Sequence, residues 1–263
     1  MQKFLRLSKE DRQLAIEQTA ARKGWVPSSV EKDFWVCWTL EQLFTLPELT
    51  GHLTFKGGTS LSKAWGLIDR FSEDIDLTIG RNALGFGGEN SPERAPSTKQ
   101  QAKRLKALRA ACGALVRDTL LSTLSSRFVA ELGADGWQLV LDLDDPDAQT
   151  LLFFYPTCFG VTQARYVRPI VRIEFGARSD PWPVYERAVR PVIAEIFPQV
   201  FTQPETIVHA LAPARTFWEK AMLLHEETYR PADKPRSRGA ARTEYPASVT
   251  ISRAATGLAA RLH

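Results

Sequence analysis

The sequence predicts a mixed α/β (α+β) domain that ends near residue 200 and is followed by a smaller helical part. Three observations predict this fold class. Two amphipathic helical patterns open the chain, a strand–Gly-Gly–helix–strand order follows at 53–79, and three strand-like segments lie between 137 and 175. After Pro181 the pattern becomes helical again. We therefore divide the chain into a domain of residues 1–200 and a C-terminal helical part of residues 201–263.

The first two helices are predicted from their caps and their apolar periodicity. Ser8 begins a helical pattern and Gly24 stands just past its end, which is the usual position of a helix-stopping glycine. The second helix is expected over 28–44. Ser28 and Glu31 have the spacing of a capping box, in which each side chain satisfies a free backbone N–H group of the first turn.

The next segment is expected to form a strand, a short helix and a second strand. Leu53–Phe55 is a short strand, Ser60–Asp69 suits a short helix, and Asp74–Ile79 alternates polar and apolar residues as a half-buried strand does. Gly80–Pro96 is rich in Gly, Asn, Ser and Pro and is longer than most loops. It is therefore either a functional lid or a disordered segment.

A long amphipathic helix is predicted from Thr98 to Leu132. One of its faces is expected to be apolar and to include Leu108 and Thr119. Between Ala95 and Arg117 it carries six cations and no acid: Lys99, Lys103, Arg104, Lys106, Arg109 and Arg117. Such a face can contact the phosphates of a nucleic acid, or it can be an ordinary solvated helix face.

The second half of the chain is expected to supply three more strands and two more helices. The strands are placed at 137–144, 151–155 and 169–175, and the helices at 184–197 and 213–227. Pro213 suits the first turn of the last helix, and Thr216 with Glu219 form a second candidate capping box.

Composition narrows the class of protein. The 34 Lys and Arg residues against 30 Asp and Glu give a net charge of only +4, and 44% hydrophobic residues are enough for a core. Cys37, Cys112 and Cys158 lie far apart among apolar residues, which indicates buried thiols in a reducing compartment. No apolar run approaches the ~20 residues of a membrane span. We expect a cytoplasmic protein that does not bind a membrane.

The Asp-x-Asp pair of the second strand predicts a metal site. Side chains two apart in a strand point the same way, so Asp74 and Asp76 should project side by side. Their charges repel unless a cation lies between them. Mg²⁺, or Mn²⁺, is suited to this position because it takes carboxylate oxygens together with water and substrate phosphate.

The glycines ahead of this pair predict a phosphate site. Gly57 and Gly58 follow a strand and precede a helix, and without a Cβ atom they let the backbone approach an anion closely. Neither of the common glycine-rich nucleotide motifs is present. The side chains expected to bind the nucleotide with the glycines are Lys56, Thr59, Ser60 and Ser72, and Lys63 adds charge.

At this point the sequence resembles a known family. "EKDFWVCWTLEQLF" (31–44), "KGGTSLSKAWGLIDRFSEDIDLTI" (56–79), "VRIEFGARSDPWP" (171–183) and "LAPARTFWEKAMLLHEE" (211–227) are similar to blocks of AbiEii-type nucleotidyltransferase toxins. These toxins occur in bacterial abortive-infection and type IV toxin–antitoxin systems. They belong to the polymerase-β-like nucleotidyltransferase superfamily.

The resemblance implies a polymerase-β-like core with a mixed sheet flanked by helices. It implies that Gly57, Gly58 and Thr59 hold the triphosphate of an NTP and that Asp74 and Asp76 bind divalent metal. A third acid, as metal ligand or general base, usually comes from a neighbouring strand, where Glu174 is the candidate. A salt bridge to Arg172 is its alternative role, and Asp142 and Asp144 are lower-ranked rivals.

The resemblance also implies the substrates and partners. Lys220 matches a phosphate-contacting lysine, and one helical turn separates it from Thr216. The acceptor of the transferred NMP is often a tRNA 3′ end, for which the cationic face of the long helix is suited. A cognate antitoxin protein is expected. After about residue 235 the chain lacks the acidic block that the family usually carries. A catalytically impaired nucleotide- or antitoxin-binding relative and an aminoglycoside-type transferase are therefore alternative functions.

Overall fold

The protein is built on one mixed sheet, as the sequence predicts. The computed structural model describes residues 1–68, 73–160 and 167–229. Its seven-stranded sheet has the order β3-β4-β5-β2-β1-β7-β6. The strands are β1 (Leu53–Lys56), β2 (Asp74–Ile79), β3 (Gln138–Leu141), β4 (Thr150–Phe154), β5 (Ile170–Gly176), β6 (Val184–Val189) and β7 (Thr206–Leu211). Both parallel and antiparallel pairs occur, since β2 runs parallel to β5 and antiparallel to β1.

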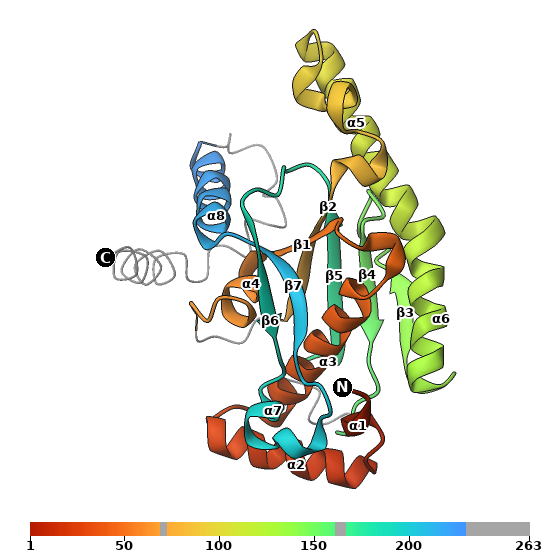
Figure 1. Ribbon diagram of the computed structural model, residues 1–263, viewed down its shortest axis with the longest axis vertical. Helices are drawn as coiled ribbons and strands as arrows, with labels where there is room; N and C mark the ends of the chain where they lie inside the picture. The colour runs from red at the N-terminus through yellow and green to blue at the C-terminus, as the bar shows by residue number, and fades with distance from the viewer. Residues whose placement is uncertain (69–72, 161–166, 230–263) are drawn as a thin grey trace.

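Helices cover the sheet and its edges (Figure 1). They are α1 (Gln2–Leu5), α2 (Lys9–Lys23), α3 (Pro27–Phe44), α4 (Gly57–Lys63), α5 (Thr98–Leu115), α6 (Leu121–Leu132), α7 (Ile193–Ile196) and α8 (Pro213–Thr228). Short 3-10 turns follow α3, as η1 (Pro47–Leu49), and α7, as η7 (Pro198–Val200). Helix α3 crosses one face of the sheet, and α5 and α6 follow its β3 side, where the start of α5 extends beyond the strands (Figure 1).

The main core lies between α3 and one face of the sheet. Trp35 and Trp38 of α3 are buried and their rings contact Phe153 of β4. Ile75 of β2 and Ile173 of β5 are fully buried in the same cluster. Because strand side chains alternate, this packing sends the polar residues of β2 and β5 to the opposite face. The core therefore determines which face carries the candidate site.

The long helix is confirmed, but its buried face differs from the prediction. A π-helical segment, η5 (Val116–Leu120), separates α5 from α6. The buried side chains follow Leu108, Cys112, Val116 and Leu120, and Thr119 is exposed. Thr119 was wrongly placed on the apolar face, since a π-turn contains one residue more than an α-turn and shifts the buried face accordingly.

The cap of α2 is confirmed and the predicted cap of α3 is wrong. Ser8 accepts a hydrogen bond from the Asp11 N–H at 3.0 Å. Helix α3 begins at Pro27, with no side-chain cap. Glu31 accepts hydrogen bonds from the Thr157 hydroxyl at 2.7 Å and the Cys158 N–H at 2.6 Å. The Glu31 carboxylate thus binds a segment that is distant in the chain and does not cap its own helix, because a buried carboxylate requires hydrogen-bond donors.

The second capping box is also wrong. Helix α8 begins at Pro213, so Thr216 lies inside the helix. Within the described residues the buried Thr216 hydroxyl has no hydrogen-bond partner, and Glu219 contacts Arg215 at 3.4 Å. Trp218 of the same helix is 63% exposed.

Residues 184–189 form strand β6 and not the predicted helix. Antiparallel pairing with β7 along the whole strand, from Val184 opposite Leu211 to Val189 opposite Thr206, supplies their hydrogen bonds. Strand β7 was not predicted, and it lies parallel to β1 inside the sheet. The sheet therefore includes residues from both sides of residue 200. The division into two domains stays a prediction.

The segment between β2 and α5 is held in place by two arginines. It forms the 3-10 turns η2 (Arg81–Leu84), η3 (Gly88–Asn90) and η4 (Pro92–Arg94). Arg81 pairs with Glu93 at 2.6 Å. Arg104 of α5 donates to the carbonyl oxygens of Glu89 and Ser91 at 2.7 and 2.8 Å. These contacts fix the segment against the start of α5.

The prediction of buried thiols is confirmed, because Cys37, Cys112 and Cys158 are all free and buried. Burial raises the pKa of each thiol, to about 12 for Cys37. None of the described helices combines the length and apolar character that a membrane span requires.

Candidate active site

The centre of the sheet brings three predicted acids and a lysine together. Asp76 of β2 lies opposite Lys56 of β1 on one side and Glu174 of β5 on the other. Asp74 is two residues before Asp76 and therefore shares its face of the sheet. Four predicted site residues thus lie on three adjacent strands.

Gly57 is required by its contact with Asp76. Its φ of 76° lies in the left-handed region that side chains disfavour. A Cβ atom there would lie 1.9 Å from Asp76 Oδ2 and 2.7 Å from Asp76 Cγ. Any other residue would displace the carboxylate. The glycine turn and the acidic pair are therefore in direct contact, as the sequence predicts for a joint site.

The hydroxyls after the glycines are less accessible than predicted. Thr59 and Ser60 are buried. The Thr59 hydroxyl donates a hydrogen bond to the Asp74 carbonyl oxygen, which ties α4 to the start of β2. Ser60 has no hydrogen-bond partner for its hydroxyl among the described residues. The nucleotide-binding role of these two residues stays a prediction.

Asp76 carries the strongest electrostatic signature of the site. Burial raises the pKa of its carboxyl, and the negative charges of Glu174 and Asp74 raise it further. Lys56 and Lys220 oppose this effect. The resulting pKa is about 7. The fold therefore concentrates negative charge that its own cations do not cancel, which is typical of functional sites.

Lys220 reaches this site from α8. Its positive charge lowers the pKa of Asp76, so the lysine lies within electrostatic range of the carboxylate. The Lys220 side chain is half-buried and not fully exposed as most helix lysines are. The helix that follows β7 thus contributes a cation to a site formed by β1 and β2.

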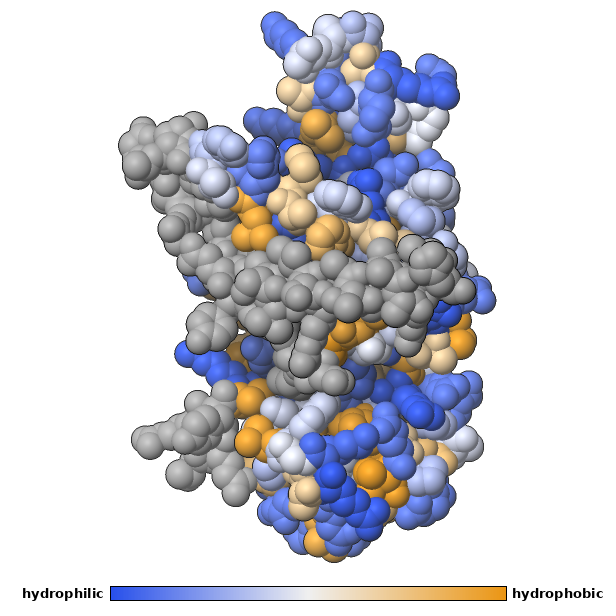
Figure 2. All heavy atoms as spheres, turned by 90° about the vertical axis from the view of Figure 1, so that its left-hand side faces the viewer, coloured by the Kyte–Doolittle hydropathy of each residue, from blue (hydrophilic) through white to orange (hydrophobic). Residues whose placement is uncertain are grey.

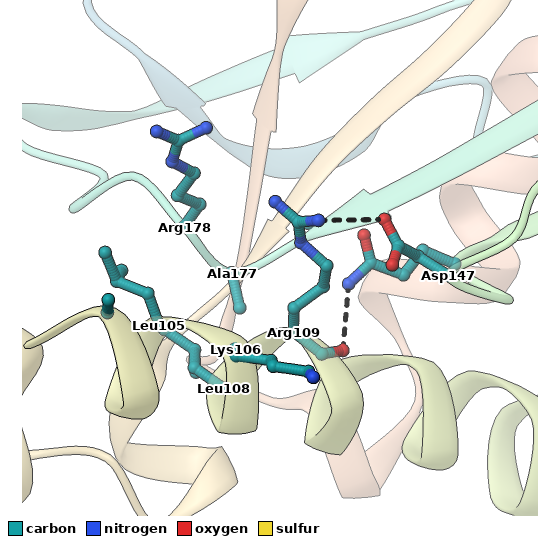
Figure 3. A pocket seen from close by; sticks show the side chains of 10 residues that line it. Leu105, Lys106, Leu108, Arg109, Asp147, Ala177 and Arg178 are labelled. Atoms are coloured by element: carbon teal, nitrogen blue, oxygen red, sulfur yellow. Dashed lines mark hydrogen bonds and ion pairs between the residues drawn. The ribbon is translucent and has the colours of Figure 1, made fainter. Parts of the chain in front are cut away.

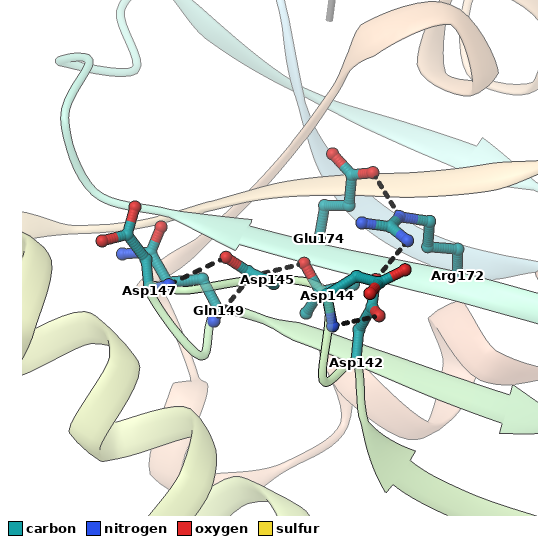
Figure 4. A network of polar contacts seen from close by, with 8 residues as sticks. Asp142, Asp144, Asp145, Asp147, Gln149, Arg172 and Glu174 are labelled. Atoms are coloured by element: carbon teal, nitrogen blue, oxygen red, sulfur yellow. Dashed lines mark hydrogen bonds and ion pairs between the residues drawn. The ribbon is translucent and has the colours of Figure 1, made fainter. Parts of the chain in front are cut away.

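Arg172 binds both Glu174, the candidate third acid of the site, and Asp142, a lower-ranked candidate for the same role (Figure 4). Arg172 Nε donates to Glu174 Oε1 at 2.6 Å, and the guanidinium also pairs with Asp142. The predicted salt bridge is therefore present. Asp142 in turn accepts the Asp144 N–H at 3.0 Å. Glu174 lies opposite Asp76 on the neighbouring strand, and its role as metal ligand or general base stays a prediction.

The residues present fit a divalent metal whose coordination is completed by substrate. Within the described ranges, no group of three or more His, Cys, Asp or Glu side chains is arranged to hold an ion alone. Asp74 and Asp76 nevertheless offer carboxylate oxygens on one face, at a position of excess negative charge. Mg²⁺ typically binds through one or two carboxylates and takes its other ligands from water and phosphate.

The prediction that Lys63 adds charge to the phosphate site is wrong. Its ammonium donates to Asp33 Oδ1 of α3 at 2.5 Å, and both side chains are largely buried. Burial opposes the charged form, but the Asp33 carboxylate outweighs it and raises the pKa of Lys63. Asp33 Oδ2 accepts the Val192 N–H at 2.7 Å. Lys63 therefore anchors the end of α4.

A second ion pair from α3 adjoins the site and was missed by sequence reasoning. The nearly buried Lys32 ammonium pairs with Glu73, the residue immediately before Asp74. Helix α3 thus holds the end of α4 through Asp33 and the start of β2 through Lys32. The signal was available, since three consecutive charged residues, 31–33, stand directly before the apolar run 34–38 of the same helix.

The predicted nucleic-acid-binding cations lie on α5. Lys99, Lys103, Lys106 and Arg109 are exposed, and Arg104 is half-buried against the preceding turns. Figure 2 shows that hydrophilic side chains predominate at this upper end of the molecule. Ser72 and the unusual C-terminal sequence after about residue 235 lie outside the described residues.

The mixed sheet, with its glycine turn against an acidic pair, indicates a nucleotidyltransferase-class α/β protein. The family described as "Nucleotidyl transferase AbiEii toxin, Type IV TA system" matches residues 38–242, which is most of the chain. The chain belongs to this family.

Comparison with solved structures finds MenT4, a nucleotidyltransferase toxin from Mycobacterium tuberculosis H37Rv, with 18% sequence identity and a TM-score of 0.43. The match covers 83% of this chain and 65% of MenT4, so this chain spans less than two thirds of that protein. A search of curated proteins gives no match.

Proposed function

We propose that this protein transfers a nucleoside monophosphate from an NTP to an acceptor hydroxyl, and that the acceptor is a tRNA 3′ end. The supporting observation is the contact between Gly57 and the half-buried carboxylate of Asp76, within a chain of the AbiEii family. In the reaction the acceptor oxygen bonds to the α-phosphorus, the bond from the α-phosphorus to the β-phosphate oxygen breaks, and pyrophosphate leaves. As a toxin, the protein would be opposed by a cognate antitoxin protein.

Asp74 and Asp76 would hold Mg²⁺ or Mn²⁺. Such an ion, when bound, supplies charge neutralisation at the reacting phosphate and orients it for in-line attack. The chain's own cations contribute beside it. Lys56 and Lys220 both act electrostatically on Asp76, so they lie where the phosphates of an NTP would need positive charge. Gly57 and Gly58 leave the backbone open to the triphosphate.

The acceptor is assigned from the family and from the cations of α5. The exposed residues Lys99, Lys103, Lys106 and Arg109 suit an acceptor stem recognised through its backbone. Glu174 is the neighbouring-strand carboxylate that would accept the hydroxyl proton or contribute to the metal site. Its bond to Arg172 fixes its position for either role.

Labelled NTPs, Mg²⁺ and total tRNA test the proposal directly. Wild-type protein should label tRNA, and Asp76→Asn should reduce the rate by roughly 100-fold or more, because one carboxylate of the metal site is lost. Asp118→Asn is the matched control, since Asp118 is exposed and pairs only with its neighbour Arg117 among the described contacts.

The outcomes separate the alternative functions. Equal activity in the two variants would overturn the site assignment. NTP binding by wild-type protein without any transfer would indicate the catalytically impaired relative. Label appearing on an aminoglycoside hydroxyl and not on RNA would indicate the small-molecule transferase.

A further inference from the structure

A separate pocket lies next to the candidate site, between α5 and the end of β5. It has a volume of about 470 Å³, and its lining includes Lys106 and Arg109 of α5 and Gly176, Ala177 and Arg178 at and after the end of β5. Figure 3 shows Lys106 and Arg109 on the wall formed by α5, and Ala177 and Arg178 on the segment that follows β5. The volume is in the range of small-ligand sites.

The charge of the pocket is positive. Its lining contains three cations, Lys106, Arg109 and Arg178, and one carboxylate, that of Asp147. Asp147 pairs with Arg109 at 3.5 Å. Among the described residues, the side chains of Lys106 and Arg178 have no ion-pair or hydrogen-bond partner, and both are exposed. Two cations are therefore available to an incoming anion without breaking an existing contact.

The pocket is also fixed in shape. The Gln149 side chain donates to the Arg109 carbonyl oxygen at 3.1 Å, which joins the residue before β4 to α5 across the pocket. Arg81 donates to the carbonyl oxygens of Ala177 and Arg178 and holds that segment in place. Leu105, Leu108 and Ala177 give the pocket an apolar surface between the cations. A phosphate with an attached base suits this combination of surfaces, because the guanidinium plane of an arginine can stack on a base.

The position of the pocket connects it to the transfer site. Gly176, in its lining, is two residues after Glu174 on β5, which corresponds to about 7 Å of extended strand. Successive nucleotides of a single strand are separated by a similar distance. A strand whose terminal hydroxyl lay near Asp76 and Glu174 would therefore place an earlier nucleotide at the pocket.

We propose that this pocket binds one nucleotide of the acceptor RNA strand, with its phosphate against Lys106, Arg109 and Arg178. The proposal rests on the proposed transfer to RNA and adds where the acceptor is held. It separates the cations of α5 into two groups, because Lys106 and Arg109 line the pocket while Lys99 and Lys103 do not. A free nucleotide offers the same chemistry, so the test must distinguish the two sources.

The experiment compares Arg178→Glu with Arg6→Glu, the same substitution at an exposed arginine that follows α1 and lies outside the proposed RNA-binding surface. Binding of a short single-stranded RNA with a free 3′ hydroxyl should weaken roughly 10-fold or more in Arg178→Glu and much less in Arg6→Glu, because only the first reverses a charge inside the pocket. In transfer assays Arg178→Glu should raise the KM for tRNA and leave kcat and the KM for NTP unchanged. Thermal unfolding checks that both variants are folded.

Equal weakening by the two variants, or a loss of NTP binding in Arg178→Glu, would overturn the proposal. The RNA-binding measurement does not depend on catalysis, so it tests the pocket even if wild-type protein transfers nothing. Conversely, active wild-type protein with an unaffected KM for tRNA in Arg178→Glu would reject the pocket and leave the transferase function intact.

Discussion

Two charged residues near the start of α3 and the acids at the centre of the sheet are arranged in opposite ways. Asp33 pairs with Lys63, and Lys32 pairs with Glu73, so these two charges of α3 each meet an opposite charge. In the sheet, burial and the neighbouring carboxylates of Glu174 and Asp74 raise the pKa of Asp76 to about 7.

The difference separates residues that hold the fold together from residues arranged for a ligand. A paired buried charge is already neutralised and leaves nothing for a ligand to stabilise. A cluster of like charges is unfavourable until a cation or a proton joins it, so its persistence in the fold indicates a binding role. The paired charges of α3 directly support the acidic cluster of the sheet, since their partners Lys63 and Glu73 end α4 and precede Asp74.

The largest expected effect on stability comes from breaking the Asp33–Lys63 pair. Asp33→Asn removes the carboxylate and leaves the Lys63 ammonium buried without its counter-ion. We expect a loss of about 3–5 kcal/mol in the free energy of unfolding, measured by urea denaturation. The double variant Asp33→Asn/Lys63→Met removes the stranded charge as well and should recover a large part of this loss.

The control for this prediction is an exposed ion pair. Arg190 and Glu205 lie 3.6 Å apart with side chains about half exposed. Glu205→Gln should cost less than about 1 kcal/mol, because water screens such pairs. If Asp33→Asn cost no more than Glu205→Gln, the buried pair would not be the anchor that its geometry indicates.

The second prediction concerns Asp76, where a substitution should increase the free energy of unfolding. Its pKa is about 7 in the folded protein and near 3.8 when unfolded, so the folded state binds the proton more tightly. Its contribution to stability is therefore present below pH 4 and is lost as the pH rises towards 7. Asn cannot ionise. The gain in the free energy of unfolding caused by Asp76→Asn should thus be larger at pH 8 than at pH 5. The difference between the two gains should be roughly 1–3 kcal/mol in the absence of divalent cations.

Denaturation at the two pH values measures this effect, and added Mg²⁺ sharpens it. Mg²⁺ should raise the melting temperature of wild-type protein at pH 8 and do much less in Asp76→Asn, because the ion neutralises the carboxylates. Asp118→Asn serves again as the exposed control. If Asp76→Asn changed the free energy of unfolding by the same amount at pH 5 and at pH 8, the carboxyl group of Asp76 would not have the raised pKa on which this prediction depends.

The same comparison explains how much could be predicted from the sequence. Asp74 and Asp76 share a face because strand alternation is local, and the α/β class follows from similarly local periodicity. The partner of Lys63 lies 30 residues earlier in the chain, so no local pattern reveals it. Glu31 failed as a cap for the same reason, since its hydrogen bonds go to residues more than a hundred positions away.

Strand β6 shows the same limit for secondary structure. Its residues carry no clear strand alternation, and four of the six are exposed. Pairing with β7 gives them their hydrogen bonds, and that partner begins some 17 residues after β6 ends. Tertiary pairing therefore determined a structure that local propensity could not.

The smallest expected effect comes from the ion pair between Lys32 and Glu73. The Lys32 side chain is 4% exposed, but that of Glu73 is 47% exposed, so water already reaches one partner. Glu73→Gln keeps a hydrogen-bond acceptor beside the ammonium and should lower the free energy of unfolding by less than about 1 kcal/mol. A cost as large as that of Asp33→Asn, measured in the same urea titration, would mean that this pair also behaves as a fully buried one. In that case the anchoring by α3 would depend equally on both pairs, and the start of β2 would be held as tightly as the end of α4.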